Sequence, residues 1–167
     1  MTTRHGGMGG GGGLGANALP QITGTVTLLG HNTTVRRDPD ASDGFRIAEI
    51  DGPHGRLTVD SVTATGGGYL EYAGTYLPTD GATLILRHST VTNSTANQGG
   101  AFEQGGGIAN YGSSTLTKTV VQHNSALNGP GIWQAPSPSV LNLVNSQIVG
   151  SAPSNCRPVG SVPGCTS

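Results

Sequence analysis

The sequence predicts an all-β fold, a parallel β-helix of about five coils. Four segments align into one matrix in which inward-type residues recur at spacings of two, three and two. A spacing of two places side chains on one face of a strand, and the extra residue indicates a bend between two short strands. The rows follow one another at 27 to 30 residues, as stacked coils with a shared core require. The sixteen positions are Leu57, Val59, Val62, Ala64, Leu84, Leu86, Ser89, Val91, Ser114, Leu116, Thr119, Val121, Leu141, Leu143, Ser146 and Ile148.

Composition agrees with a strand-rich, folded chain. Glycine (29) and proline (10) are abundant, and no stretch keeps a long apolar period of about 3.6 residues, which excludes an all-helical fold. Leu, Ile, Val and Phe make up only about 20 per cent, close to the level of disordered chains. Disorder also needs a high net charge, whereas this chain has a formal charge of −1. Because composition does not distinguish a disordered chain from a folded one, the regular spacing of the matrix leads us to predict a folded chain.

The first coil is expected to begin at Leu19. Its bend, at residues 30–32, is two residues longer than the bends of the later rows. Residues 45–48 are expected to form a short third strand, and residues 51–56 to turn the chain into the first matrix row. The inward residues of this coil are Val26, Leu28, Thr33 and Val35.

A Gly-x-Gly-Ile unit in the segments between the later rows predicts a third face. Gly107 precedes Ile108, and Gly131 precedes Ile132. Glycine supplies the positive φ that tight corners need, and each isoleucine supplies an inward residue. Three faces in each coil give the triangular cross-section of a parallel β-helix.

The third matrix column is mostly hydroxylic, with Ser89, Thr119 and Ser146 after Val62. Because buried polar atoms need partners, we expect these hydroxyls to bond backbone groups of the bends. This reading makes the column a structural ladder.

Charge and length patterns exclude some partners. Only eight Lys and Arg occur in 167 residues, without a basic run, which argues against nucleic acid. No apolar run approaches the roughly 20 residues of a membrane helix. Residues 1–18 are glycine-rich, without the apolar centre of a signal peptide, and should be a flexible tail. We divide the chain into this tail, a β-helix over residues 19–153 and a C-terminal loop over residues 154–167.

The two cysteines, Cys156 and Cys165, are nine positions apart across a loop rich in proline and glycine. A disulfide is favoured; over so short a loop it would contribute about 2–3 kcal/mol. It would indicate an oxidising compartment. The alternative is two free thiols in a loose tail. Because an exported disulfide conflicts with a missing signal peptide, we expect the natural start to lie upstream of Met1.

Residues 84–96, 99–102, 105–110, 115–126 and 141–153 resemble right-handed parallel β-helix repeat proteins. They are similar to the polymorphic outer-membrane-protein type of repeat, marked by Gly-Gly-Ala/Gly-Ile units and Asn-ended turns. The resemblance covers residues 19–165 and implies an exported, surface or extracellular protein of the pectin-lyase-like fold. Two features depart from the pattern: residues 66–82 lack the glycine-isoleucine unit, and an N-terminal capping region is absent.

Asp60 and Arg87 occupy one outward slot on adjacent rows. They could belong to a sugar-binding groove, because β-helix enzymes act on sugars through clustered acids. The alternative is an exposed ion pair worth under about 1 kcal/mol. No second carboxylate follows in that slot, where Thr117 and Val144 come next.

Residues 38–49 contain acidic residues at spacings similar to those of a calcium-binding loop, but Asp43 occupies the position where such a loop needs a turn glycine. A polar turn before a strand is the favoured reading. The five histidines fall in the tail or in turns, and His88 and His123 occupy different slots, so no nucleophilic triad is indicated.

Four aromatic residues could offer a sugar-stacking platform, since rings with a polar edge suit half-wet surfaces. Ordinary packing of a loop onto the coils is the favoured alternative. Outward threonine ladders at Thr63/Thr90 and Thr65/Thr92 end in the next rows, too early for a flat ice-binding face. The four aromatic residues are Tyr69, Tyr72, Tyr76 and Trp133.

The preferred function is an exported β-helix that presents a surface for adhesion or glycan contact, with a polysaccharide or cell-surface ligand as partner. We expect no catalytic residue, no metal and no cofactor, and leave the binding residues open. The alternative is a fragment of a polysaccharide lyase or glycoside hydrolase on the same fold. The first coil, lacking a cap, exposes a strand edge and could self-associate.

Overall fold

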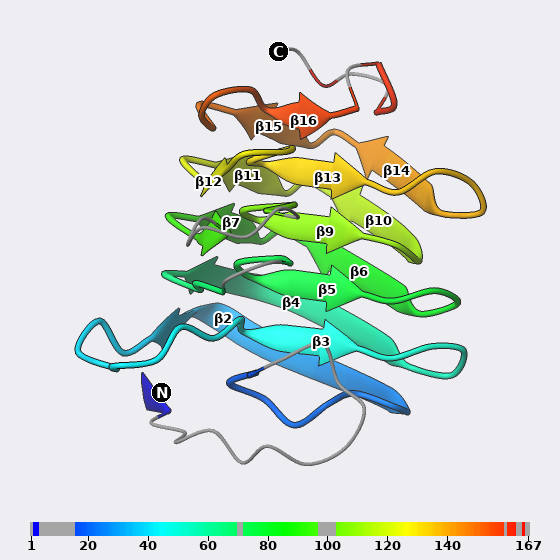
Figure 1. Ribbon diagram of the computed structural model, residues 1–167. Helices are drawn as coiled ribbons and strands as arrows, with labels where there is room; N and C mark the ends of the chain where they lie inside the picture. Colours follow the sequence, from blue (N-terminus) through cyan, green and yellow to red (C-terminus); the bar gives the residue numbers. More distant parts are fainter. Residues whose placement is uncertain are drawn as a thin grey trace.

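A computed structural model describes residues 2–3, 16–69, 72–96, 103–158, 160–162 and 165. The described residues form an all-β parallel solenoid without a helix (Figure 1). About four turns place five layers of strands above one another, which confirms the predicted fold class. The two ends of the chain lie at opposite ends of the stack (Figure 1).

The largest sheet supplies two of the three faces of each coil. All its strand pairs are parallel, in the order β14-β10-β6-β4-β7-β11-β15, and β2 pairs with β4 and with β1. Its strands are β1 (Thr2–Thr3), β2 (Thr25–Arg37), β4 (Arg56–Thr65), β6 (Thr83–Arg87), β7 (Thr90–Thr92), β10 (Ser113–Thr117), β11 (Val120–Gln122), β14 (Val140–Val144) and β15 (Gln147–Val149).

The third face is a five-stranded parallel sheet in the order β16-β13-β9-β5-β3. A two-stranded sheet, β8 (Thr95–Ala96) with β12 (Ser125–Ala126), lies between the faces along the chain. The strands of the third face are β3 (Ala48–Ile50), β5 (Tyr76–Pro78), β9 (Ile108–Asn110), β13 (Ile132–Gln134) and β16 (Cys156–Arg157). The third strand, expected at residues 45–48, runs instead from Ala48 to Ile50, and Arg46 before it forms an isolated bridge with Asn17.

The strand register confirms the matrix. Leu57, Leu84, Ser114 and Leu141 are paired in succession from coil to coil, and the second and fourth columns keep the same order. Hydrogen bonds connect members of the third column. Side chains of the inner rows are buried, as Leu86 and Leu116 are at 0% exposure. Leu141 and Leu143 are half-buried because no described strand lies above β14. One continuous core therefore runs through the stack.

Left-handed backbone conformations recur at three corners along the stack, and the third corner, just before the third face, holds Ala73, Gly105 and Gly129. The φ angles of these corner residues lie between 46° and 69°, a region that few residues other than glycine adopt. The longer first bend holds His31 and Asn32, and it shifts the register between Leu29 and Thr33 as predicted. The first corner holds Ser61, His88, Lys118 and Asn145; the second holds Gly66, Asn93, His123 and Gly150.

The first glycine of each Gly-x-Gly-Ile unit has the expected positive φ, 68° at Gly105 and 58° at Gly129. The glycine directly before each isoleucine is required for another reason. Gly107 and Gly131 do not have positive φ angles. A Cβ on Gly107 would lie 2.6 Å from the carbonyl oxygen of Gly131 in the next coil. Close approach of neighbouring backbones, not a left-handed turn, therefore selects glycine here.

The hydroxyl column bonds the bends as predicted. Ser89 Oγ donates to Arg87 O at 2.7 Å and accepts from Val62 N at 3.3 Å. Thr119 N donates to Ser146 Oγ at 3.0 Å in the coils above. A second interior ladder at the next corner was not predicted from the sequence. Its members are Ser94, Asn124 and Ser151, each linked to the next by a backbone N–H.

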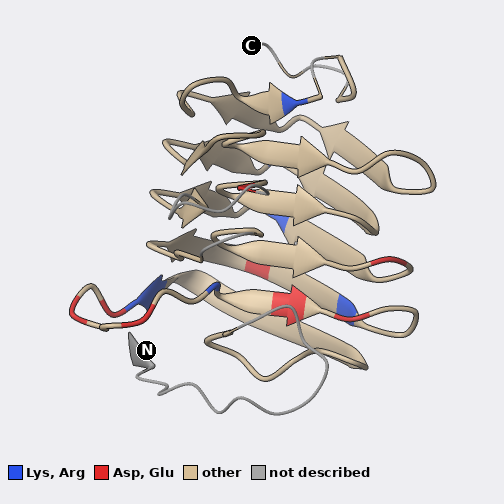
Figure 2. Cartoon of the chain, in the orientation of Figure 1, with Lys and Arg blue, Asp and Glu red and all other residues tan. Residues whose placement is uncertain are grey.

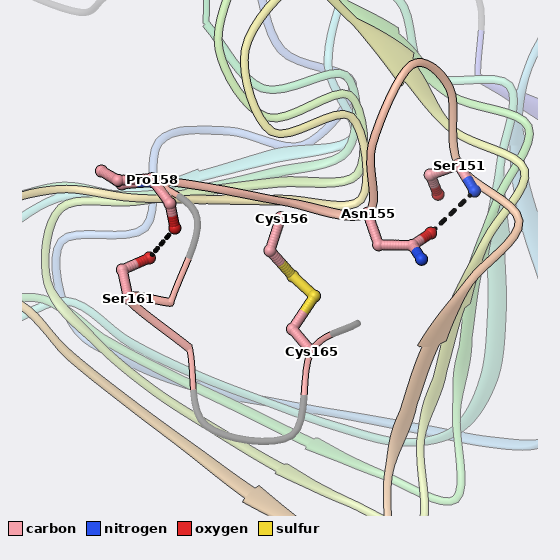
Figure 3. The surroundings of a disulfide bond; sticks show 6 residues. All are labelled: Ser151, Asn155, Cys156, Pro158, Ser161 and Cys165. Carbon is pink, nitrogen blue, oxygen red and sulfur yellow. Dashed lines mark hydrogen bonds between the residues drawn. A yellow bond between two sulfur atoms is a disulfide. The ribbon is translucent and has the colours of Figure 1, made fainter. Parts of the chain in front are cut away.

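The C-terminal loop is closed by the predicted disulfide between Cys156 and Cys165, whose Cα atoms are 6.3 Å apart (Figure 3). Val162 in this loop is 3% exposed and packs into the main core. Ser161 Oγ donates to Pro158 O at 2.7 Å within the turn. The loop therefore covers part of the core at the C-terminal end of the stack.

Candidate functional site

Three aromatic rings gather on the outer side of the third face. Tyr72 and Tyr111 meet edge to face, with ring centroids 6.0 Å apart. Tyr111 and Trp133 are closer, at 4.7 Å between centroids and tilted by 44°. All three side chains are half-buried. We call these three residues the aromatic cluster.

Strand alternation places Trp133 on the outside. Ile132 and Gln134 of β13 are buried, and the residue between them points to the opposite side of the sheet. Its register partner below is Ala109, and its partner above is the exposed Arg157. Along the stack, this outward position is therefore occupied by the small Ala109, then by the aromatic Trp133 and then by the cationic Arg157.

The cluster covers an apolar patch outside the solenoid. Leu77 and Ala109 point outward from β5 and β9, yet both are 0% exposed. With Ala73 they form a second hydrophobic cluster, against which Tyr72 and Tyr111 pack. The patch therefore supports Tyr72 and Tyr111 from one side, and Trp133 contacts Tyr111.

Polar groups border the rings. The Tyr111 hydroxyl donates to the side-chain oxygen of Gln104. Burial, with a further contribution from Tyr72, raises the pKa of Tyr111, so its phenol stays protonated and able to donate. Ring faces beside hydroxyl and amide groups are suited to the apolar faces and hydroxyls of a sugar.

Two of the four aromatic residues expected in a platform lie elsewhere. Tyr76 is 2% exposed in the main core, and burial raises its pKa. The ring of Tyr69 lies under the guanidinium of Arg46, at 4.5 Å from Cζ to the centroid. Tyr111, which completes the cluster, was missed; it lies in the turn after β9, and its contacts with Tyr72 and Trp133 join different coils.

Asp60 and Arg87 are register partners on adjacent coils, as predicted. The closer partner of the Asp60 carboxylate, however, is the corner residue His88, at 3.2 Å from Nδ1 to Oδ1. Ser61 Oγ donates to the same carboxylate oxygen at 2.8 Å. The hydrogen bonds from Ser61 and His88 lower the pKa of Asp60, and the charge of Arg87 adds a smaller effect.

Carboxylates are confined to the lower part of the stack. Most of the chain coloured as Asp, Glu, Lys or Arg in Figure 2 lies on the lower coils, and the sequence carries no Asp or Glu after Glu103. The outward slot of Asp60 continues as Arg87, Thr117 and Val144. The upper coils therefore cannot supply the pair of carboxylates that glycoside hydrolysis ordinarily uses.

In the acidic turn at residues 38–43, the backbone carbonyl groups bind the side chain of Arg37. Arg37 Nη1 donates to the carbonyl oxygens of Ala41 at 3.2 Å and Asp43 at 3.4 Å. Asp40 N donates to Asp38 Oδ1 at 3.1 Å. Among the described residues, no three His, Cys, Asp or Glu side chains are grouped as a metal site would need.

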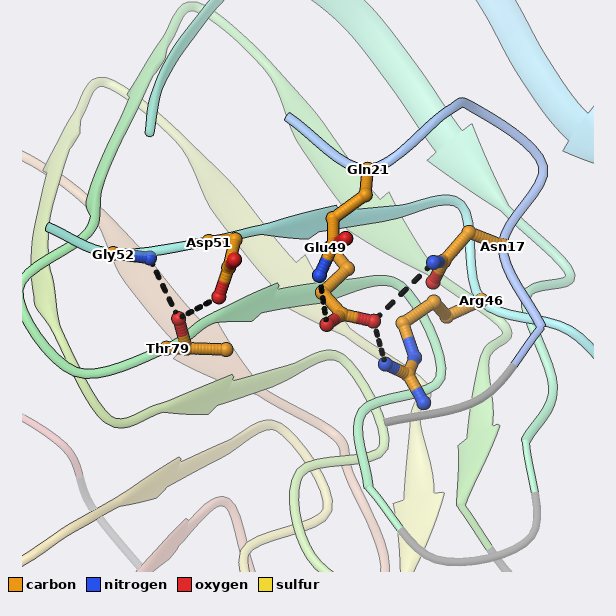
Figure 4. Close-up of polar contacts among 7 residues, drawn as sticks. All are labelled: Asn17, Gln21, Arg46, Glu49, Asp51, Gly52 and Thr79. Carbon is orange, nitrogen blue, oxygen red and sulfur yellow. Dashed lines mark hydrogen bonds and ion pairs between the residues drawn. The ribbon is translucent and has the colours of Figure 1, made fainter. Parts of the chain in front are cut away.

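Glu49, the last acid of that stretch, belongs instead to a buried ion pair (Figure 4). Arg46 Nη1 donates to Glu49 Oε2 at 2.9 Å, and the two side chains are 0% and 1% exposed. Asn17 and Gln21 also donate to the carboxylate, at 3.2 and 3.0 Å. Through Asn17 and Gln21, the Glu49 carboxylate holds residues 17–21 against the third face. This ion pair was not predicted from the sequence.

Comparison with known proteins gives no match among family models, curated proteins or solved structures. The β-solenoid therefore rests on the strand register of this chain. No described segment forms a helix long and apolar enough to span a membrane.

Proposed function

We propose that this protein is an exported β-helix that binds glycans through the aromatic cluster and does not transform them. The observation that carries the proposal is the contact of Tyr72, Tyr111 and Trp133 on a rigid outer face. Half-buried rings over a packed apolar patch offer a preformed surface, which limits the entropy lost on binding.

The chemistry around the cluster favours a neutral or weakly acidic glycan. The sequence after Glu103 contains no Asp or Glu, and Lys118 and Arg157 are the only Lys and Arg in that part of the sequence. Arg157 is exposed in the slot directly above Trp133 and could pair with a carboxylate of a uronic acid.

Export is supported by the disulfide between Cys156 and Cys165, because such bonds persist in oxidising compartments. The expected likeness to polymorphic outer-membrane-protein-type repeats and the pectin-lyase-like fold belongs to the same proposal. Recovery of the protein from culture medium with no titratable thiol would support it, and retention in the cytosol as a dithiol would contradict it.

The binding test uses a panel of neutral and uronic-acid polysaccharides with titration calorimetry. We expect Trp133→Ala to weaken the affinity for the best binder by about tenfold, roughly 1.4 kcal/mol. Leu127→Ala is the matched control, because Leu127 is apolar and 58% exposed but is not part of the cluster. Absence of binding by the wild type, or an equal loss in both variants, would reject the proposal.

The second candidate is a polysaccharide lyase or hydrolase fragment, and the observation that favours it is the ionised Asp60 beside His88 and Arg87. The same panel is incubated with and without calcium and assayed for unsaturated or reducing ends. Product formation that disappears in Asp60→Ala would establish the enzyme and displace the binding proposal.

A further inference from the structure

Exposed large apolar side chains are confined almost entirely to the first and last coils. Of the six such residues in the described part of the chain, only Leu127 lies outside these coils. Val26 and Leu29 of β2 are 43% and 65% exposed. The remaining three, on β14 and β15, are Val140, Val144 and Val149, at 46%, 47% and 39%.

Val26 lies in the inward column of Leu57, on a strand edge where no described strand is paired. The other four end-coil residues lie in outward slots, where the inner coils carry polar residues. Val144 continues the slot that holds Asp60, Arg87 and Thr117. Leu29, at the opposite end of the stack, occupies this slot too. The last coil also has Val140 where earlier coils have Arg56, Thr83 and Ser113, and Val149 where they have Thr65, Thr92 and Gln122.

Within the described part of the chain, both end coils have strand edges that are unpaired over most of their length. Above β14 and β15 no described strand follows, and β2 is paired below only at Arg36 and Arg37. β14 and β15 contain no charged residue, and the charges of β2 are these two arginines at its end. Proteins usually protect a free edge with charges or prolines, so apolar edges without them indicate a partner.

We propose that these edges bind one another, so that residues 25–35 of β2 in one copy add in parallel to β14 and to Gln147 and Ile148 of β15 in a second copy, while Arg36 and Arg37 keep their pairing with β1. The register of the inner coils then continues across the contact: Val26 follows Leu141, and Leu29 follows Val144. The long corner of β2 already faces a one-residue corner at Ser61 on its paired side, and it would face an equivalent corner at Asn145. This inference does not depend on glycan binding.

The C-terminal loop limits the contact to the strand edges. Val162 and Cys165 pack against the core at that end of the stack, so the second copy meets β14 and β15 and not the enclosed core. The contact joins different surfaces of the two copies and does not close on itself, and the expected product is therefore an open series of oligomers.

The test is sedimentation velocity of the full chain over a range of concentrations. We expect the wild type to form a concentration-dependent series, and Leu29→Lys and Val144→Lys each to sediment as a monomer. An equimolar mixture of the two variants retains one intact pair of edges and should give a dimer that grows no further. Circular dichroism and thermal melting establish that each variant is folded, and Val140→Lys replaces Val144→Lys if the latter does not fold.

Thr117→Lys is the matched control, because it adds the same charge to the same slot on an inner coil. It should retain the wild-type series. The proposal is overturned by a wild type that stays monomeric at every concentration, by Val144→Lys forming dimers on its own, or by Thr117→Lys dissociating the oligomers equally.

Discussion

Several positions in this chain are determined by how closely two coils approach. Gly107 is such a position, because a Cβ there would lie 2.6 Å from the carbonyl oxygen of Gly131. Gly24 is the opposite case, with nothing within 4 Å of the same added atom. Sequence inspection identifies both as glycine and cannot tell them apart, since the difference lies in a neighbouring coil.

We expect Gly107→Ala to lower the free energy of unfolding by about 2 kcal/mol, because the added methyl group forces two backbones apart. Gly24→Ala should change it by less than about 0.5 kcal/mol. Equilibrium denaturation of both variants measures the difference. Equal effects would show that backbone approach does not select glycine at residue 107.

Asp60 provides a prediction about pH. Its pKa is lowered chiefly by the hydrogen bond from Ser61 and then by His88, so the ionised form is favoured in the folded chain. The resulting stability is present above the ordinary carboxyl range near pH ~4 and is lost as the pH falls through the lowered pKa.

Ser61→Ala and His88→Ala should each raise the pKa of Asp60, as followed by carboxyl carbon NMR. Arg87→Gln should raise it least, because Arg87 is the last of the causes. A larger shift in Arg87→Gln than in the other two would mean that the aligned arginine, and not the corner residues, controls the carboxylate.

Among the elements, the C-terminal loop is held by both a covalent bond and an apolar contact. The disulfide joins Cys156 of β16 to Cys165, and Val162 between them is 3% exposed. The spacing of the cysteines predicted the bond. It could not predict that the enclosed loop packs on the core, because this depends on where β16 ends relative to the coil below.

Replacing both cysteines by serine should lower the free energy of unfolding by about 2–3 kcal/mol, the value expected for a loop of this size. Val162→Ala leaves the bond intact and tests the apolar contact separately. Chemical denaturation of the two variants gives both values. A double serine variant as stable as the wild type would show that the closed loop contributes nothing to the fold.

Considered as a whole, the molecule is a stack in which each coil is stabilised by its neighbours. Leu116 and Leu143 occupy one inward column, yet Leu116 is 0% exposed and Leu143 is half-buried on the last strand. The same residue type in the same slot should therefore contribute differently along the stack.

We expect Leu116→Ala to cost about 3 kcal/mol, because it removes buried methyl groups and leaves a cavity between two coils. Leu143→Ala should cost about 1 kcal/mol, because water can fill part of the space. Urea denaturation of the two variants tests this order. The reverse order would mean that the last coil is covered more fully than its strand edge suggests.

The sequence by itself determined the repeat, the inward columns, the long first bend and the disulfide, because each depends on spacing within one coil or on adjacent residues. Only the tertiary structure decided which outward residues meet. The aromatic cluster joins Tyr72, Tyr111 and Trp133 from three coils, and Arg46 and Glu49 form an ion pair where a calcium loop was considered. The lengths of the irregular segments between rows place these side chains, and no periodic pattern constrains those lengths.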